Sequence, residues 1–239
     1  MNNNYLSECN VTMSNALVRS SHSLSLQEKR IICACIAKNN SRFGQKRDAH
    51  LAPLLKEMKF KVTAKDYNEL FDVDMKHCYS ILKESADNLL NRQFRIEEIR
   101  KGKKQYVKYN WLGFVRYAED EGFIELAFSQ YAYPHLNALN KLLTTYKLKN
   151  AQAFRSIYTW RLYELIMQFK DTRWLSISVD ELRIALDTPS SYTWKDFRVK
   201  AIDRAVNELN KKLGLAMSYE RFKTGRKITS LKFTWDKTL

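Results

Sequence analysis

The stretch LSISVDELRIAL, residues 175–186, combines a short strand pattern with the start of an amphipathic helix. Its first residues alternate between apolar side chains and serine, which is typical of a half-buried strand. Ser178 and Glu181 have the spacing of a capping box, in which two side chains satisfy free backbone amides at a helix start. The stretch therefore predicts a strand that leads directly into a helix.

The same order occurs earlier in the chain, in FKVTAKDYNELF, residues 60–71, with Thr63 and Asp66 at the capping positions. The similarity returns after a second helical segment, where ADNLLNR (86–92) matches AVNELNK (205–211). The chain therefore contains the same structural unit twice.

Each second helical segment is followed by two strand-like runs around a basic turn. In the first copy RQFRIEEI leads through RKGKK to QYVKYNWLGFVRY, and in the second LAMSYERF leads through KTGRK to ITSLKFTW. Strand, helix, helix and a two-stranded ribbon is the order of a winged helix-turn-helix. We predict an α+β fold of two tandem winged-helix domains, with an additional hairpin in the first at YAEDEGFIELAF.

The domain boundaries are predicted from changes in the hydrophobic pattern. Residues 1–23 are polar and aperiodic, so we expect a mobile N-terminal arm. A helix should begin at Ser25, which has capping-box spacing to Glu28, and end at Asn39-Asn40-Ser41. We assign 24–142 to the first domain and 143–239 to the second, which should open with a long helix in AQAFRSIYTWRLYELIMQF.

Net charge narrows the choice of partner. The 239 residues carry a formal net charge of +15, with 45% hydrophobic and 13% aromatic residues, which suits a globular protein that binds a polyanion. No apolar run is long enough to span a membrane, and the N-terminal residues lack the pattern of a secretory signal. We therefore favour nucleic acid over an anionic membrane surface, and a cytoplasmic location.

Cysteine and histidine usage argues against a metal site. No cysteine has CxxC spacing, and Cys33 and Cys35 lie in RIICACIAK, where a buried helix face is expected. With Cys9 and Cys78 they are predicted to be reduced thiols. The four histidines form no HxH or HExxH pattern, and the acidic runs DVD and EDE lie where turns are expected. We predict a non-enzymatic protein without metal or cofactor, although thirteen tyrosines leave a catalytic tyrosine open.

The strongest candidate for a DNA contact is WKDFRVKAIDRAVNELNKK, residues 194–212, which reads as one amphipathic helix. Between 195 and 239 there are twelve Lys or Arg and five Asp or Glu. A merely solvated helix face is the alternative to a recognition helix that enters the major groove. Arg198 is ambiguous, because its helical angle falls on the buried side. The candidate contacts on this helix are Lys195, Arg198, Lys200, Arg204, Asn207 and Lys211.

The ribbon tips are candidate phosphate contacts. In FKTGRK a hairpin turn at Gly225 is expected, because the glycine spacing of a phosphate-binding loop is missing. Phosphate contacts fix register without reading sequence. In the first domain the second helix, 74–91, has mixed charge, so that domain is predicted to be a phosphate clamp or a protein-contact module. The tip residues concerned are Lys223, Arg226 and Lys227 in the second domain and Arg100, Lys101, Lys103 and Lys104 in the first.

Residues from about 15 to 236 resemble the replication initiators of iteron-containing, theta-replicating plasmids, the group that includes the F-plasmid initiator. Four stretches carry the resemblance through their order and spacing: LSLQEKRII, WRLYELI, SYTWKDFRVKAIDRAVNELN and YERFKTGRKITSLKF. Where close relatives have a run of arginines after the DF of the third stretch, this chain has Arg198-Val199-Lys200. Val199 could contact a thymine methyl group, so a different target sequence is expected.

The resemblance implies two winged-helix domains and a bacterial protein that binds repeated origin sites, the iterons, as a monomer. It implies help in opening an adjacent AT-rich segment and recruitment of the host initiator and the replicative helicase. It also implies dimers, joined through the first domain, that repress the protein's own gene. In this sequence Arg198, Lys200 and Arg204 would read the iteron, with Arg226 and Lys227 in the wing.

Other functions remain open at the level of sequence. A transcriptional regulator would use the same two domains to bind one palindrome as a dimer. A rolling-circle nicking protein would cut DNA with a metal, which the missing histidine pair disfavours. An RNA-binding protein is a third alternative. The gene could come from a prophage or a cryptic plasmid equally well.

Overall fold

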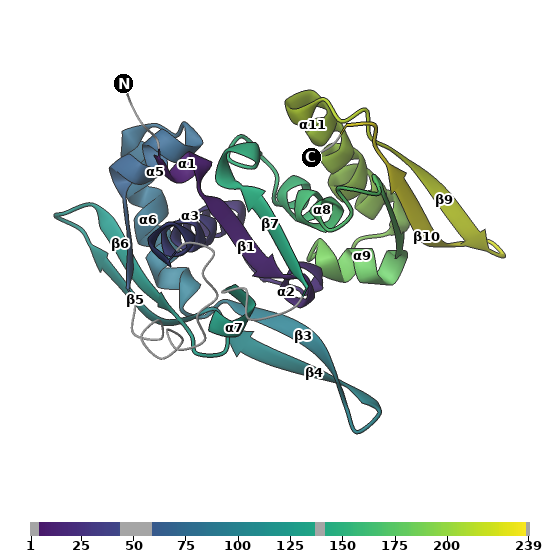
Figure 1. The fold of residues 1–239 in the computed structure, drawn as a ribbon, viewed down its shortest axis with the longest axis horizontal. Coiled ribbons are helices and arrows are strands. Elements are labelled where there is room, and N and C mark those ends of the chain that lie inside the picture. The colour runs from purple at the N-terminus through teal and green to yellow at the C-terminus, as the bar shows by residue number, and fades with distance from the viewer. Residues whose placement is uncertain (1–4, 44–58, 137–141, 238–239) are drawn as a thin grey trace. The chain divides into compact units, whose positions relative to one another are not determined.

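The computed structural model describes residues 5–43, 59–136 and 142–237. The chain divides into two compact units (Figure 1). The first contains Met1–Leu17 and His22–Ala153, and the second contains Val18–Ser21 and Phe154–Leu239. The change from the first unit to the second thus lies between Ala153 and Phe154, about one element later than the predicted boundary.

The N-terminal residues are folded into the protein. They form a short helix, a strand and a second short helix: α1 (Tyr5–Glu8), β1 (Asn10–Ser14) and α2 (Asn15–Arg19). β1 pairs antiparallel with β7 (Leu143–Lys147), and Val11 and Met13 are fully buried. The prediction of a mobile arm over residues 1–23 is therefore wrong for residues 5–23, and residues 1–4 lie outside the described residues.

The pairing with β1 also explains the later boundary. β7 and the following turn η2 (Leu148–Asn150) belong to the first unit because β7 completes its two-stranded sheet. The backbone amide of Leu148 donates a hydrogen bond to the carbonyl of Cys9 over 3.0 Å. This bond continues the pairing of β1 with β7 by one residue beyond the strands.

The central helix of the first unit is α3 (Leu26–Phe43), which packs against β1 and β2 (Phe60–Thr63). Its predicted capping box is confirmed, since the Ser25 hydroxyl accepts from the Glu28 amide and the Glu28 carboxylate accepts from the Ser25 amide. Every residue from Ile31 to Ala37 is fully buried, including Cys33 and Cys35. The helix continues two residues beyond its predicted end.

A winged helix completes the first unit. Its sheet has the order β2-β6-β5, and α3, α5 and α6 pack around it. The capping box of Thr63 and Asp66 is present at the start of α5. The remaining elements are α5 (Ala64–Phe71), α6 (Met75–Leu89), β5 (Leu112–Ala118), β6 (Phe123–Phe128) and the short helix α7 (Tyr133–Leu136).

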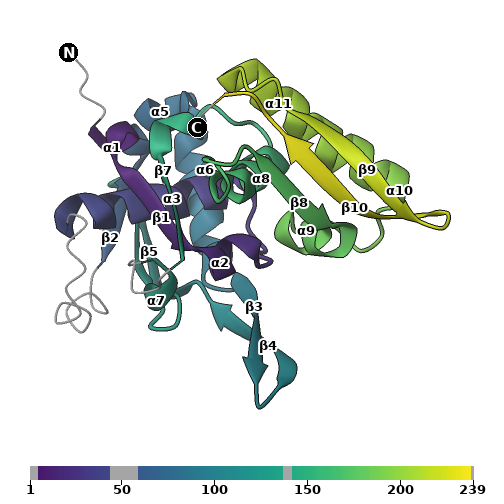
Figure 2. The same ribbon diagram turned by 45° about the vertical axis from the view of Figure 1, so that its right-hand side comes forward.

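The wing of the first unit differs from the prediction. β5 and β6 form the hairpin that pairs with β2, so they are the wing. The basic hairpin of β3 (Gln93–Arg100) and β4 (Lys103–Asn110) is instead a separate two-stranded ribbon that extends from the unit (Figures 1 and 2). The predicted long strand is interrupted at Trp111, whose buried indole donates to the carbonyl of His22 over 3.1 Å.

The second unit repeats the same winged helix. Its sheet has the order β8-β10-β9, which matches β2-β6-β5 of the first unit strand for strand. The capping box of Ser178 and Glu181 is confirmed. The elements are β8 (Trp174–Ser178), α9 (Val179–Ala185), the helical segments α10 (Trp194–Asp196), η3 (Phe197–Asp203) and α11 (Arg204–Leu213), and the strands β9 (Ser218–Thr224) and β10 (Lys227–Thr234).

The core helix of the second unit is α8 (Ile157–Met167), shorter than predicted because Ser156 precedes its first turn. The fully buried Arg161 organises the surrounding backbone. Its guanidinium donates hydrogen bonds to the carbonyls of Val18, Ser20 and Ala185 and forms an ion pair with the buried Glu164. These bonds hold residues 18–21 in the second unit.

Candidate nucleic-acid interface

The candidate recognition helix is continuous through α10, η3 and α11. It begins after Thr193, whose hydroxyl accepts a hydrogen bond from the Asp196 amide over 3.1 Å, and it ends at Gly214. Gly214 has a φ of 64°, the left-handed conformation that commonly ends helices. The apolar side of the helix is buried against the core of the unit through Phe197, Ala201, Ala205 and Leu209.

The opposite side of the helix carries most of the predicted contact residues. They are exposed, as the helical projection predicted, and so is Val199, which is 47% exposed. These residues are Lys195, Lys200, Arg204, Asn207 and Lys211. The structure thus provides a basic face long enough to lie in a groove of duplex DNA, and contact with DNA remains a prediction for each residue.

Arg198 is placed differently from the projection. The segment η3 is a π-helix, in which backbone hydrogen bonds span five residues. In an α-helix residues five apart lie about 140° from each other around the axis. The wider turn brings Arg198 to the side of Asp203, and Nε lies 3.6 Å from Oδ2. Arg198 therefore lies at the edge of the basic face, 38% exposed, rather than inside the unit.

Lys200 is also held by an acidic neighbour. Its amine lies 2.9 Å from Oδ1 of Asp196 and 5.1 Å from the centre of the Tyr192 ring. Hydrogen bonds from Lys200 and then from Thr193 lower the pKa of Asp196 to about 2. The same pair raises the pKa of Lys200, so the lysine stays fully charged at neutral pH.

The wing of the second unit is the hairpin of β9 and β10. Its turn contains Gly225, whose φ of 60° is a conformation that glycine adopts without strain. Lys223, Arg226 and Lys227 are all exposed around this turn, as predicted. Phosphates of a nucleic-acid backbone are the ligands that such a tip suits.

The corresponding surface of the first unit has the opposite charge. The tip of its wing carries Glu119, Asp120 and Glu121. On α6, the equivalent of the recognition helix, the amine of Lys83 lies 2.6 Å from the Glu119 carboxylate, and Asp74 caps the first turn. This surface is unsuited to a polyanion.

The basic residues predicted for the first wing lie on the β3-β4 ribbon. The turn between these strands places Lys101 and Gly102 at positive φ, with values of 52° and 71°. The four tip residues are exposed, and the Lys104 amine lies 2.8 Å from the Glu97 carboxylate. The cations Arg100, Lys101, Lys103 and Lys104 are therefore brought together at the tip of the predicted hairpin, but this hairpin is not the wing.

Models of known protein families match both units. The model described as "Initiator Replication protein, WH1" matches residues 10–167, and that described as "Initiator Rep protein, WH2" matches residues 178–235. The chain belongs to the replication initiator family. The two matches are to the WH1 and WH2 winged-helix domains of this family, and the WH1 match extends through α8, which lies in the second unit.

Individual relatives agree with the family match. The chain is 27% identical over 246 residues to the PI protein of Escherichia coli, with 88% of this chain and 77% of that protein covered. It is 25% identical over 228 residues to an uncharacterized 27.6 kDa protein of Escherichia coli, covering 92% and 93% of the two chains. A crystal structure of the Pi initiator protein in complex with iteron DNA shares the fold, with a TM-score of 0.72, 22% identity and coverage of 96% and 97%.

Several residues of the initiator's basic surface were not found from the sequence. Arg183 of α9 lies 4.3 Å from the centre of the Phe197 ring and donates to the carbonyl of Thr193, at the start of the recognition helix. Arg221 is exposed on β9. Asp196 and Asp203 were counted only as charges. The i,i+4 spacing of Asp196 and Lys200 could have suggested their ion pair. Arg198 and Asp203 are five residues apart, and the π-helical turn that brings them together has no signal in the sequence pattern.

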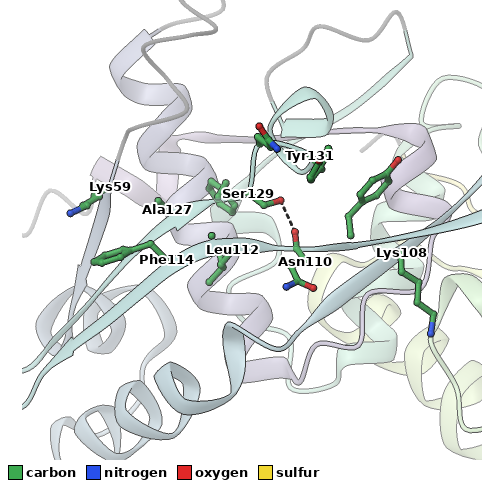
Figure 3. A pocket seen from close by; sticks show the side chains of 12 residues that line it. Lys59, Lys108, Asn110, Leu112, Phe114, Ala127, Ser129 and Tyr131 are labelled. Carbon is green, nitrogen blue, oxygen red and sulfur yellow. Dashed lines mark hydrogen bonds between the residues drawn. The ribbon is translucent and has the colours of Figure 1, made fainter.

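The first unit contains a pocket (Figure 3). Its floor contains Leu112 and Ala127, and the rings of Tyr109 and Tyr131 stack at 5.3 Å beside it. The amines of Lys59 and Lys108 point away from each other at opposite ends of the view. Since these cations do not converge, one small anion could not contact both.

Metal-ligating residue types were compared for their positions in the structure. Within 5–43, 59–136 and 142–237 there is no group of three or more His, Cys, Asp or Glu that could hold a metal ion. The acidic runs DVD and EDE lie at turns, as predicted, while His50 lies outside the described residues. Over the same ranges, no helix has both the length and the apolar character needed to cross a membrane.

Proposed function

We propose that this initiator binds repeated duplex DNA sites, the iterons, at a replication origin and reads them with its second unit. One observation supports this assignment most strongly. The two units have the same winged-helix topology, but the helix and wing of the second carry exposed cations where the first has an acidic wing tip. A polyanion would be attracted by one surface and repelled by the other.

Within this proposal the recognition helix supplies sequence specificity. Lys200 and Arg204 are exposed near its middle and can reach base edges in a major groove. Val199 offers an apolar contact for a thymine methyl group. Arg198 contributes from the edge of the face, next to Asp203.

Phosphate contacts supply much of the affinity. The wing residues Lys223, Arg226 and Lys227 would bind one stretch of backbone. The tip of the β3-β4 ribbon would act as a second phosphate clamp, through Arg100, Lys101, Lys103 and Lys104. Each phosphate neutralised should steepen the dependence of binding on salt.

The broader role follows the family. We propose that the protein is non-enzymatic and cytoplasmic, that it promotes opening of an AT-rich segment beside its sites and that it recruits the host initiator and the replicative helicase. A dimer joined through the first unit would repress the protein's own gene. The matched family and the similarity to the PI protein support these steps.

A nuclease footprint on DNA that flanks the protein's own gene, with magnesium present, tests the proposal. We expect protection of several evenly spaced direct repeats beside an AT-rich tract. A single protected palindrome over the promoter would indicate a regulator instead of an origin-binding protein. A discrete cut would show a nicking enzyme, and preferential competition by structured RNA would show an RNA-binding protein.

A further inference from the structure

The recognition helix of the second unit contains three carboxylates. Glu208 accepts hydrogen bonds from Arg155 and Thr159, whereas each of the other two lies beside a cation of the helix. The amine of Lys200 lies 2.9 Å from Asp196, and Nε of Arg198 lies 3.6 Å from Asp203, which is an ion-pair contact longer than a hydrogen bond. Acidic residues are unfavourable beside a phosphate backbone, so their presence on a DNA-binding face needs a physical explanation.

Both carboxylates are themselves fixed by a second partner. The Thr193 hydroxyl donates to Oδ2 of Asp196 over 2.7 Å, which leaves Oδ1 for Lys200. The Tyr219 hydroxyl donates to Oδ1 of Asp203 over 2.6 Å, which leaves Oδ2 for Arg198. Each acid therefore presents one oxygen to its cation in a defined direction, and for Asp203 the π-helical turn is what makes the pairing possible.

We propose that Asp203 and Asp196 are positioning residues that give the recognition helix its sequence specificity. Each holds its cation in one orientation and keeps it from binding any phosphate that comes near. A cation held in this way contributes to binding only where a base edge accepts a hydrogen bond from it. That bond then offsets the repulsion between the acid and the nearby phosphates. Random DNA brings phosphates close to the acids without offering the matching base edge, so its affinity for the protein is lower.

Paired and unpaired basic side chains differ in how they contact DNA. A long basic side chain without a partner contacts phosphates of every sequence equally, which raises affinity but not discrimination. Fixing the side chain before binding reduces the conformational entropy lost on forming a base contact. The acids therefore lower non-specific affinity and favour the site where the cation already points at its base.

The test rests on the proposed function and uses the full-length protein. Two duplexes of equal length are compared at several KCl concentrations, one with the footprinted sequence and one with the same bases shuffled. In Asp203→Asn we expect about threefold to tenfold tighter binding to shuffled DNA and a salt slope steeper by about one unit. The preference for the footprinted duplex should fall about tenfold.

Three further variants separate positioning from charge. Asp203→Glu should restore most of the preference. Tyr219→Phe keeps the charge but removes the bond that orients Asp203, so the preference should fall with the salt slope unchanged. Asp236→Asn removes an exposed acid elsewhere in the second unit and should leave the preference as it is. If Asp203→Asn melts early, Asp196→Asn takes its place in the same comparison.

The outcomes distinguish the two proposals. A wild-type protein that binds both duplexes equally would overturn the proposed function and this inference together. A wild-type preference that Asp203→Asn and Asp196→Asn both retain would overturn this inference alone. An equal change in affinity for both duplexes would also overturn this inference, because it would show that the acid acts only through its charge.

Discussion

The hydroxyl of Tyr219 donates a hydrogen bond to the carboxylate of Asp203 over 2.6 Å, and this bond joins the wing of the second unit to its recognition helix. Burial, together with this bond, raises the pKa of Tyr219 to about 12, so the phenol remains a donor at any physiological pH. The two parts of the proposed DNA-binding surface are therefore joined directly to each other in the protein without DNA.

Replacing Lys200 with alanine should remove discrimination at one base pair of the site. A lysine that contacts a base edge contributes about 1–3 kcal/mol of discrimination, which its removal should abolish. Affinities for a panel of duplexes with single-base substitutions measure this directly. Lys212→Ala, which removes an exposed cation near the end of the same helix, serves as the control. If Lys200→Ala weakens binding to every duplex equally, Lys200 is only a phosphate contact.

Replacing Lys227 with alanine should weaken binding to all sequences to the same extent. Loss of one phosphate contact should lower the salt slope by about one unit. Binding measured against KCl concentration gives the slope. Lys170→Ala removes an exposed cation of the same unit away from the wing and should leave the slope unchanged. The wing would be excluded as a phosphate contact by an unchanged slope in Lys227→Ala.

Replacing Arg161 with leucine should destabilise the second unit strongly. The change removes three hydrogen bonds to backbone carbonyls and the ion pair with the buried Glu164. Breaking a buried ion pair in this way costs about 3–5 kcal/mol of the free energy of unfolding. Urea unfolding, followed by a probe in the second unit, measures the loss. The double change Arg161→Leu with Glu164→Leu should recover part of it, and no recovery would mean that the ion pair is unimportant.

His135 should make the first unit sensitive to mild acid. Burial lowers the pKa of His135, so near pH 6 the folded protein binds fewer protons than the unfolded chain. Its contribution to stability is complete above the ordinary histidine pKa of about 6.5 and is lost as pH falls from there through the lowered pKa. Melting temperatures at pH 7.5 and 5.5 should therefore differ less in His135→Gln than in the wild type. His77→Gln, at an exposed histidine, should behave as the wild type.

The sequence predicted the local elements well because their signals are local. All three capping boxes form where two residues three positions apart predicted them, at Ser25, Thr63 and Ser178. The strand-helix-helix repeat and the winged-helix topology are confirmed for the same reason. The exposed face of the recognition helix was also predicted correctly, because the spacing of the apolar residues determines which side of the helix is buried.

Features that depend on distant partners were missed. β1 is stabilised by β7, more than 120 residues away, so its short alternating pattern was read as part of a mobile arm. The ribbon β3-β4 was taken for the wing because of its basic tip, whereas strand pairing assigns that role to β5 and β6. Arg198 was placed by a projection that assumes an α-helix, which the π-helical turn does not obey.

Residues 18–21 have a consequence for how the protein is dissected and synthesised. A fragment that begins at 143 or 154 would contain Arg161 but not the carbonyls of Val18 and Ser20 that it binds. We therefore expect such a fragment to be less stable than the second unit of the whole chain. During synthesis on the ribosome, residues 18–21 are made early, and they can form these hydrogen bonds only after Arg161 has emerged. Genetic fusions and truncations should therefore keep residues 18–21 together with residues 154–239.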